Sequence, residues 1–351
     1  MKYIFLFLII VLSINVLNAQ EHKEYYDNGN LKISGQYDSN DSKIGEWKQY
    51  YENGPLMQIE VFENGKQMGE VKVFHENGQL MIIGVGENGQ PTGEWKEYYE
   101  SGKLNVVRTY KNGELNGKNN TYYENGGLYI EREYLSGKAV GGGKDYYQNG
   151  ELKAIAKFEN GQKTGESKEY YKNGVLSGVG LYENDQKNGE WKEHHENGQL
   201  SGVGMYLNDE KTGEWKKYNE SGKLNGVRTY KKGELDGLTT TYYENGELQM
   251  IGRMENNIQT GEWKEYHDNG ELAAVGSLEN GKMSGEWKAY DNFGRSLEIL
   301  MFKDGEKLTG EWIEYHKNGQ KKVSGYYEDG EKALNWVYFD ENGEIIKLET
   351  N

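Results

Sequence analysis

The chain of 351 residues contains no cysteine and only two prolines. Without cysteine there can be no disulfide bond, no thiolate nucleophile, no cysteine-ligated zinc and no cysteine lipid anchor. Long apolar runs are also scarce, because after Gln20 no segment is apolar enough to cross a bilayer. The apolar fraction is 35%, below the ~45–50% of typical globular domains, so we do not expect a thick interior.

Positive charge is the next deficit. Lysine and arginine number 41 against 57 aspartates and glutamates, which gives a net charge of −16. Nucleic acids and anionic membrane surfaces attract basic patches, and this composition opposes both. We therefore expect no nucleic-acid partner.

Glycine is abundant, with 49 residues, and it is periodic. An opening glycine recurs every 24 residues at Gly45, Gly69, Gly93, Gly117, Gly141, Gly165, Gly189, Gly213, Gly237, Gly261 and Gly285. A closing glycine ends the first turn of each copy at Gly29, Gly54, Gly78, Gly102, Gly126, Gly150, Gly174, Gly198, Gly222, Gly246, Gly270, Gly294, Gly319 and Gly343. A fixed period indicates a repeat array, which grows by units and needs no central core. We predict one repeat domain over residues 20–351.

Each copy reads as two strands and two turns. Glu46–Tyr51 is β-prone, Glu52–Gly54 is a turn, Leu56–Phe62 is β-prone, and Glu63–Lys66 is a second turn. Asn-Gly between β-prone runs is a strong hairpin signal, and frequent glycine argues against helices. The sequence predicts an all-β fold: an elongated array of about 14 hairpin units and 28 strands in a single continuous twisted sheet.

Positions within the copy separate framework from surface. The residue seven before the closing glycine holds all the tryptophans: Trp47, Trp95, Trp191, Trp215, Trp263, Trp287, Trp312 and Trp336. We interpret these as structural aromatics, and the invariant closing glycines as structural turn residues. The residue three before the closing glycine varies among Tyr99, His75, Asn219 and Asp291, which we interpret as a solvent-facing site.

The turn type decides which residues pair across a hairpin. A two-residue loop would place Trp95 opposite Arg108, and Trp191 opposite Gly204. A three-residue loop with a bulge would place Tyr50 opposite Leu56 and Trp47 opposite Ile59. A slip of one residue reverses the faces. We favour the three-residue loop, because it pairs apolar residues with apolar residues.

No residue set predicts chemistry. His194 and His195 are adjacent on a predicted strand, so they point to opposite faces and make a poor metal pair. Carboxylates are spread throughout, and neither a calcium loop nor a phosphate-binding loop is present. We expect no catalytic, cofactor-binding or metal-binding residues and no cofactor, and we predict that the protein is not an enzyme. The ligand-binding residues are unknown at this stage.

The N-terminus predicts export. Lys2 is followed by the apolar run Tyr3–Leu12, and Ala19 offers a small residue for cleavage. This pattern is typical of a signal peptide over residues 1–19, and the run is too short to span a membrane. We expect a location in the periplasm, on the outer surface or outside the cell, with no transmembrane segment after cleavage.

The spelling G-E-W-K-x-Y-Y-x-N-G-x-L followed by Y-x-N-G-K, as in Gly93–Leu104, resembles the bacterial MORN repeat variant family. That family includes proteins labelled YwqK-type toxin–antitoxin system antitoxins. The resemblance covers residues 20–348. It implies stacked β-hairpins and a role in protein contact or scaffolding.

Two functional classes follow from the sequence. The first is a non-catalytic protein-interaction or envelope scaffold, because long repeat surfaces suit extended protein partners. The second is a carbohydrate- or cell-wall-binding module, because exposed stripes of tyrosine and tryptophan can stack on a glycan. An antitoxin or immunity-like role is a further alternative.

Overall fold

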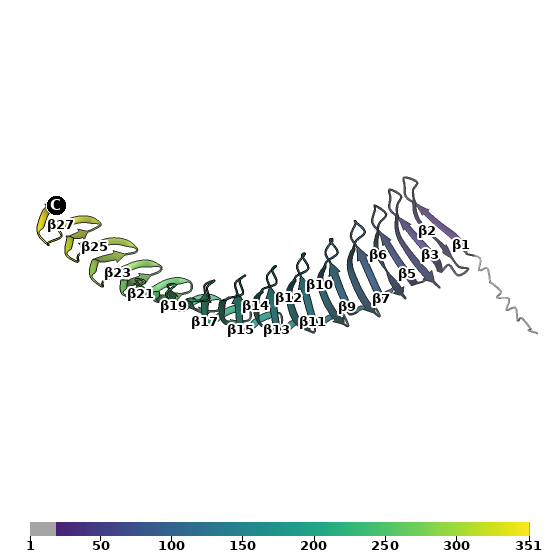
Figure 1. Cartoon of the computed structure of the whole chain (residues 1–351). Coiled ribbons are helices and arrows are strands. Elements are labelled where there is room, and N and C mark those ends of the chain that lie inside the picture. The colour runs from purple at the N-terminus through teal and green to yellow at the C-terminus, as the bar shows by residue number, and fades with distance from the viewer. Residues whose placement is uncertain (1–18, 351) are drawn as a thin grey trace, which may run out of the picture. The chain divides into compact units, whose positions relative to one another are not determined.

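The computed structural model describes residues 19–350, which form 28 strands of one open antiparallel sheet and no helix. Strands that follow one another in the chain lie side by side, as β3 and β4 do (Figure 1). No helix of the described residues is long and apolar enough to span a membrane. The predicted all-β hairpin array is confirmed. The predicted signal peptide, apart from Ala19, lies outside the described residues.

The chain divides into two compact units, Met1–Leu152 with Lys157–Gly161, and Lys153–Ala156 with Gln162–Asn351. The first unit contains β1 (Gln20–Tyr25), β2 (Leu31–Tyr37), β3 (Lys43–Tyr50), β4 (Leu56–Glu63), β5 (Lys66–Phe74), β6 (Leu80–Glu87), β7 (Gln90–Tyr98), β8 (Leu104–Lys111), β9 (Glu114–Tyr122), β10 (Leu128–Leu135) and β11 (Lys138–Tyr146). Strand β12 (Leu152–Glu159) contributes residues to both units.

The second unit contains β13 (Gln162–Tyr170), β14 (Leu176–Glu183), β15 (Gln186–His194), β16 (Leu200–Leu207), β17 (Glu210–Tyr218), β18 (Leu224–Lys231), β19 (Glu234–Tyr242), β20 (Leu248–Glu255), β21 (Ile258–Tyr266), β22 (Leu272–Glu279), β23 (Lys282–Tyr290), β24 (Ser296–Lys303), β25 (Glu306–Tyr315), β26 (Lys321–Glu328), β27 (Glu331–Phe339) and β28 (Ile345–Thr350).

The two ends of each hairpin use different turns. At one end Gly54 has φ +104°, its N–H donates to Tyr51 O at 2.9 Å, and Tyr51 N–H donates to Pro55 O at 2.8 Å. This is the predicted three-residue loop with a left-handed glycine. At the other end Asn64 and Gly65 both have positive φ, 51° and 77°, which is the two-residue type I′ turn that Asn-Gly favours.

The predicted register is correct next to the turn and wrong further along the strand. Tyr50 pairs with Leu56 as predicted, but the register shifts between Gln49 and Tyr50. As a result Trp47 pairs with Glu60 and not with Ile59. In the same way Trp95 pairs with Arg108 and Trp191 with Gly204, which are the pairs of the rejected alternative. A single bulge therefore reconciles both registers, because it adds one residue and reverses the faces beyond it.

The opening glycine lies in a second bulge, which the sequence analysis did not predict. Gly180 pairs with Trp191, but its neighbour Leu181 pairs with Asn188, so two extra residues lie between Asn188 and Trp191. Gly189 is one of them and has φ +72°. Glycine tolerates this conformation because it has no Cβ. Its recurrence every 24 residues is the signal of this bulge.

The position three before the closing glycine belongs to the framework, contrary to the prediction that it faces solvent. The Tyr99 hydroxyl donates to Tyr122 O at 2.7 Å, and His75 Nε2 lies 3.0 Å from Tyr98 O. Each bond ties one copy to a main-chain carbonyl of the next. The same tie is made by Tyr26, Tyr51, Tyr123, Tyr171, Tyr243, His195, His267 and His316. Both ring types carry a donor at similar reach, which explains why tyrosine and histidine alternate here.

Asparagine before the closing glycine makes a parallel ladder. Asn77 Oδ1 accepts from Gln79 N–H at 2.9 Å within its own turn, and its Nδ2 donates to Glu100 O of the next copy at 2.9 Å. The opposite edge is tied through the backbone, as when Gly113 N–H donates to Pro91 O at 3.1 Å. Hydrogen bonds thus join neighbouring copies along both edges of the sheet, and no central core is needed.

Candidate functional site

Five of the eight tryptophans are buried in the sheet, whereas Trp95, Trp287 and Trp312 are partly exposed. Trp191 and Trp215 are 1% and 0% exposed. Seven tryptophans lie against a glycine of the preceding strand, where a Cβ would overlap the indole ring. The pairs are Gly35–Trp47, Gly84–Trp95, Gly180–Trp191, Gly204–Trp215, Gly252–Trp263, Gly276–Trp287 and Gly325–Trp336. The glycine therefore makes the slot that the indole fills.

Copies without tryptophan change both members of this pair. Where Gly143 stands in the tryptophan position, Arg132 stands in the glycine position. The Arg132 guanidinium lies 4.7 Å from the centroid of the Phe158 ring and is paired with Asp145 at 2.6 Å. Arg108 likewise pairs with Asn119, and Arg228 with Thr239. A long side chain on one strand thus compensates for a short one on the next. This exchange is visible in the sequence but was not predicted from it.

A lysine covers the open face of several of these indoles. Lys187 Nζ lies 3.9 Å from the Trp191 ring centroid, and Lys211 Nζ lies 3.9 Å from that of Trp215. Because a glycine occupies one face of each ring, the ammonium must lie over the other face, in cation–π contact. The ring of Tyr206 meets Trp191 nearly edge-on, with centroids 6.0 Å apart and an interplanar angle of 81°.

We call this arrangement of a tryptophan and the aromatic residue of the following strand an aromatic corner. Five corners have nearly the same geometry, with ring centroids 6.0 to 6.5 Å apart: Trp47–Phe62, Trp95–Tyr110, Trp191–Tyr206, Trp215–Tyr230 and Trp312–Tyr327. In four of them a lysine of the same copy lies over the rings: Lys43, Lys187, Lys211 and Lys307.

Carboxylates balance the lysines in the middle of the array. Glu193 lies 3.5 Å from Lys211 Nζ and 2.6 Å from Lys217 Nζ. Burial lowers the pKa of Lys211, although Glu193 opposes that effect. Burial alone would raise the pKa of Glu193, but the hydrogen bond and charge of Lys217 hold it below its ordinary value. Burial, with help from Glu193, raises the pKa of Tyr206 to about 12, so this hydroxyl stays protonated at neutral pH.

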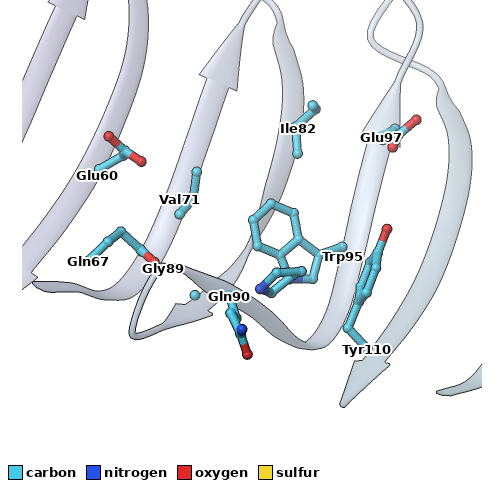
Figure 2. Close-up of a pocket in the computed structure, with 11 residues that line it drawn as sticks. Glu60, Gln67, Val71, Ile82, Gly89, Gln90, Trp95, Glu97 and Tyr110 are labelled. Atoms are coloured by element: carbon cyan, nitrogen blue, oxygen red, sulfur yellow. The ribbon is translucent and has the colours of Figure 1, made fainter. Parts of the chain in front are cut away.

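The corner of Trp95 and Tyr110 has no lysine. Pro91 stands in the lysine position, and Gly86 stands where most other copies have an aromatic residue before the tryptophan. A pocket of about 350 Å³ lies at this corner, and Trp95, Tyr110, Glu60, Glu97, Val71 and Ile82 line it together with Gln67 and Pro91 (Figure 2). Glu97 is paired with Arg108.

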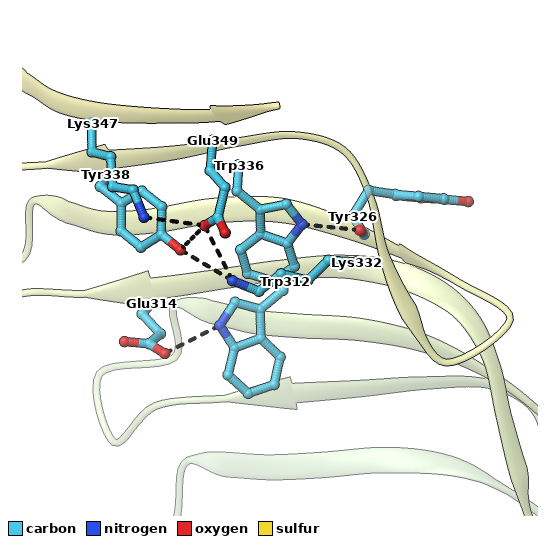
Figure 3. Close-up of polar contacts among 8 residues, drawn as sticks. All are labelled: Trp312, Glu314, Tyr326, Lys332, Trp336, Tyr338, Lys347 and Glu349. Atoms are coloured by element: carbon cyan, nitrogen blue, oxygen red, sulfur yellow. Dashed lines mark hydrogen bonds and ion pairs between the residues drawn. The ribbon is translucent and has the colours of Figure 1, made fainter. Parts of the chain in front are cut away.

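In the final copy an exposed lysine makes contacts of the same kind (Figure 3). Lys332 Nζ lies 4.4 Å from the Trp336 ring centroid, 3.1 Å from the Tyr338 hydroxyl and 3.4 Å from Glu349 Oε2. The Tyr338 hydroxyl donates to Glu349 at 2.7 Å. Indole face, hydroxyl and carboxylate together make a compact site for an ammonium group.

The other face of the sheet carries a different pattern, which we call the Glu–Lys stripe. In G-E-W-K the glutamate and the lysine flank the tryptophan, so their side chains point away from the indole. Ion pairs recur there, for example Glu94–Lys96 at 2.8 Å and Glu286–Lys288 at 2.7 Å. Beside them lies the residue seven after the closing glycine, which includes the exposed Val85, Leu181, Met205 and Met301. In other copies this position holds Thr109, Lys157, Thr229 or Arg253.

The remaining predicted residues have structural places. All fourteen closing glycines have positive φ, between +76° and +104°. The described residues contain no group of three or more histidines and carboxylates placed to hold a metal ion. His194 lies four residues before its closing glycine, where other copies have tyrosine or phenylalanine, and its Nδ1 is buried without a partner. Burial and the nearby Lys192 lower the pKa of His194.

The family comparison gives one result. The model described as MORN repeat variant matches ten segments that together cover more than half of the chain: 21–39, 43–64, 69–88, 91–112, 163–184, 187–208, 211–232, 235–256, 259–280 and 308–330. The unmatched stretch 113–162 includes the copies with Asn119 and Gly143 in the tryptophan position.

No curated protein matches the chain. Among solved structures, the crystal structure of TcdB2-TccC3 without its hypervariable C-terminal region is 10% identical, with a TM-score of 0.16. The Photorhabdus luminescens Tc holotoxin pore with the TccC3-D651A mutation is 10% identical, with a TM-score of 0.13. Each match covers 94% of this chain and 23% of the other, so the chain spans less than a quarter of those structures. At such TM-scores the likeness carries no argument about fold or function.

Proposed function

Because this chain belongs to the MORN repeat variant family, we propose that it is an exported, non-catalytic repeat protein that serves as a protein-interaction or envelope scaffold. Repeat arrays present one surface many times over, which suits an extended protein partner. The proposal includes export through the N-terminal segment, with the partner in the envelope or outside the cell.

One observation carries this proposal, and it is the Glu–Lys stripe. The ion pairs repeat from copy to copy, whereas the neighbouring residue changes between apolar, polar and charged types. Leu181 and Met205 occupy this position in successive copies and are 48% and 45% exposed. Isolated exposed apolar residues are common, but here two of them occupy the same position in neighbouring copies on one face of the sheet.

Site-specific photocrosslinking tests the proposal. A photoreactive residue at Met205 should trap a discrete protein in the producing cells. The same residue at Glu220, in an exposed turn at the edge of the sheet, is the matched control. The double variant Leu181→Asp/Met205→Asp should abolish the crosslink placed at Val179 or Val203 while leaving the circular dichroism unchanged. Equal labelling from Met205 and Glu220 would argue against a partner on the stripe.

Export is tested separately by cell fractionation and by the mass of the purified protein. The proposal expects a chain in the envelope or medium that has lost residues 1–19. A full-length chain confined to the cytoplasm would overturn the export part and would favour the antitoxin alternative. No observation favours that alternative here.

The carbohydrate-binding alternative assumed exposed stripes of tyrosine and tryptophan. Trp47, Trp191, Trp215, Trp263 and Trp336 are at most 5% exposed, so these five do not offer a stacking surface. A glycan array with the mature protein would test the alternative directly. Retention on glycans with no protein crosslink would replace the scaffold proposal.

A further inference from the structure

The pocket at Trp95 and Tyr110 is an aromatic corner from which the usual occupant is missing. Its rings stand 6.2 Å apart at 76°, against 6.2 Å and 71° for Trp47 and Phe62. In the Trp47 corner Lys43 Nζ lies 4.2 Å from the indole centroid and 4.9 Å from that of Phe62. Pro91 stands in place of that lysine and cannot reach over the rings. The corner therefore keeps the geometry that receives an ammonium without supplying one.

The Trp95 indole offers its face and little else. Its N–H already donates to Val85 O at 3.1 Å and to Thr92 O at 3.2 Å. The backbone of Gly84 lies against one face, where a Cβ would overlap the ring. What remains is the second face, which is electron-rich and attracts a cation. The ring of Tyr110 closes the corner beside it.

Acceptors lie in the wall of the same pocket, on the far side of Val71 from the Trp95 ring (Figure 2). Glu60 is half-buried in the wall of the pocket, and Gln67 lies beside it with its Oε1 next to Gly86. A carboxylate and an amide oxygen are the acceptors that an ammonium group requires. Gly86 stands where several other copies have a tyrosine, such as Tyr182 before Trp191. The Gln67 amide fills the place of its Cβ, and the pocket continues along Val71 and Ile82, where an apolar stem has room.

We infer that this pocket binds a primary ammonium group on an alkyl stem, held over Trp95 and Tyr110, with the Glu60 carboxylate in the wall of the same pocket. The chain itself demonstrates the chemistry, because four equivalent corners hold a lysine ammonium of their own. The inference goes beyond the scaffold role and does not depend on it. Two sources can supply the group: a lysine side chain of a partner protein, or a free alkylamine.

The test is a titration of the mature protein followed by NMR of the tryptophan indole N–H signals. The probes are n-pentylammonium and the neutral 1-pentanol, with an acetylated and amidated Gly-Lys-Gly peptide and its Nε-acetyl-lysine counterpart. We expect n-pentylammonium to shift the Trp95 signal and to bind at least about fivefold more tightly than 1-pentanol, since a cation–π contact and a carboxylate act together. Binding of the lysine peptide but not of its acetylated form would identify a protein source. Binding of the free amine alone would identify a small-molecule source.

Two variants complete the test. Pro91→Lys should fill the pocket with the chain's own ammonium and prevent binding, while the signals of Trp191 and Trp215 stay in place and report an intact fold. The fold accepts a lysine at this place, because Lys43 occupies it in an equivalent corner. The backbone contact is also the same, since Gly65 N–H donates to Lys43 O and Gly113 N–H donates to Pro91 O. Glu60→Gln should lower the affinity for n-pentylammonium several-fold without changing the affinity for 1-pentanol.

Equal affinities for n-pentylammonium and 1-pentanol would overturn the inference, because the pocket would then be merely apolar. Full binding by Pro91→Lys would also overturn it, since the ligand would then lie elsewhere. A shift of Trp95 by chitotriose but not by the amine would assign the pocket to a glycan instead. None of these results bears on the crosslinks from Met205, so the scaffold proposal is tested independently.

Discussion

Single positions in this repeat contribute unequally to the structure, and their variability in sequence does not reveal which contribute most. The closing glycine is invariant because its φ is left-handed, near +86° at Gly198. The residue three positions earlier varies, yet it joins neighbouring copies through the same carbonyl contact whether it is tyrosine or histidine. At this position, variation between tyrosine and histidine preserves one hydrogen-bonding function. Beside the Glu–Lys stripe, variation in residue type accompanies exposure to solvent.

Substitutions at Gly198 and His195 allow a direct comparison of these contributions to the free energy of unfolding. Gly198→Val should destabilise by more than about 1 kcal/mol, because a β-branched residue is strained at positive φ. Space is not the cause, since the nearest atom to a new Cβ is Val175 Cγ1 at 3.7 Å. His195→Ala should cost about 1 kcal/mol, because it removes the bond to Tyr218 O. Urea denaturation measures both.

His195→Tyr is the matched control, because tyrosine makes the same contact in other copies. It should retain the stability of the parent protein. If His195→Ala were as stable as the parent, the tie between copies would contribute nothing, and the position would be a surface site as the sequence analysis predicted.

His194 should make the stability of its hairpin depend on pH. Burial and Lys192 lower its pKa in the folded state, whereas the unfolded residue titrates near 6.5. The unfolded chain therefore binds a proton first, and stability falls as pH drops from about 6.5 towards the folded pKa. His194→Tyr should lose this part of the pH dependence. Urea midpoints of both proteins above and below pH ~6.5 would show it, and parallel curves would contradict it.

At the scale of the strand, the pairing of glycine and tryptophan organises the packing. Gly204 and Trp215 come from adjacent strands, β16 and β17, and the volume of one is set by the volume of the other. The arginine copies keep the same balance with opposite sizes. Strand packing is thus specified by pairs of positions in neighbouring copies and not by either position alone.

A double-mutant cycle tests this coupling. Gly204→Ala should destabilise by about 1–3 kcal/mol, because the new methyl group overlaps the Trp215 indole. Trp215→Ala alone should cost about 3–5 kcal/mol. In the Trp215→Ala background, Gly204→Ala should cost much less than it does alone. Additive losses would show that the two sites do not share one volume.

The sequence predicts most of this fold because the turns are local. Asn-Gly and the invariant closing glycine specify both loops, and the 24-residue period specifies the order of the strands. The register could not be predicted beyond Gln49, since it depends on a bulge whose stabilising contacts come from the neighbouring copy. The pocket at Trp95 was also out of reach. It arises because Gly86 replaces an aromatic residue and Pro91 replaces a lysine. These replacements become informative only when the lysine over other tryptophans is known.

At the scale of the whole molecule, stability is a property of neighbours. Within each compact unit a strand contacts chiefly the strands before and after it. A sheet built in this way has no common core through which a local loss could spread. Its units should therefore loosen separately.

Hydrogen exchange measured by mass spectrometry checks this expectation. Trp215→Ala should speed exchange in β16, β17 and β18, which surround the lost indole. Strands β25, β26 and β27 belong to the same compact unit but do not contact the site, and they should exchange at the parental rate. Faster exchange throughout that unit would reveal a cooperative block in place of independent neighbours.

The ladders at the two edges of the sheet have a consequence for how such a gene can change. Each tie joins a copy only to its immediate neighbour, so removing or adding a whole copy leaves an equivalent junction between the copies that become adjacent. Residues 101–126 nearly recur as 221–246, which is the trace expected from recombination between misaligned copies. Selection can then adjust the number of copies in one genetic event, without first passing through a chain that fails to fold.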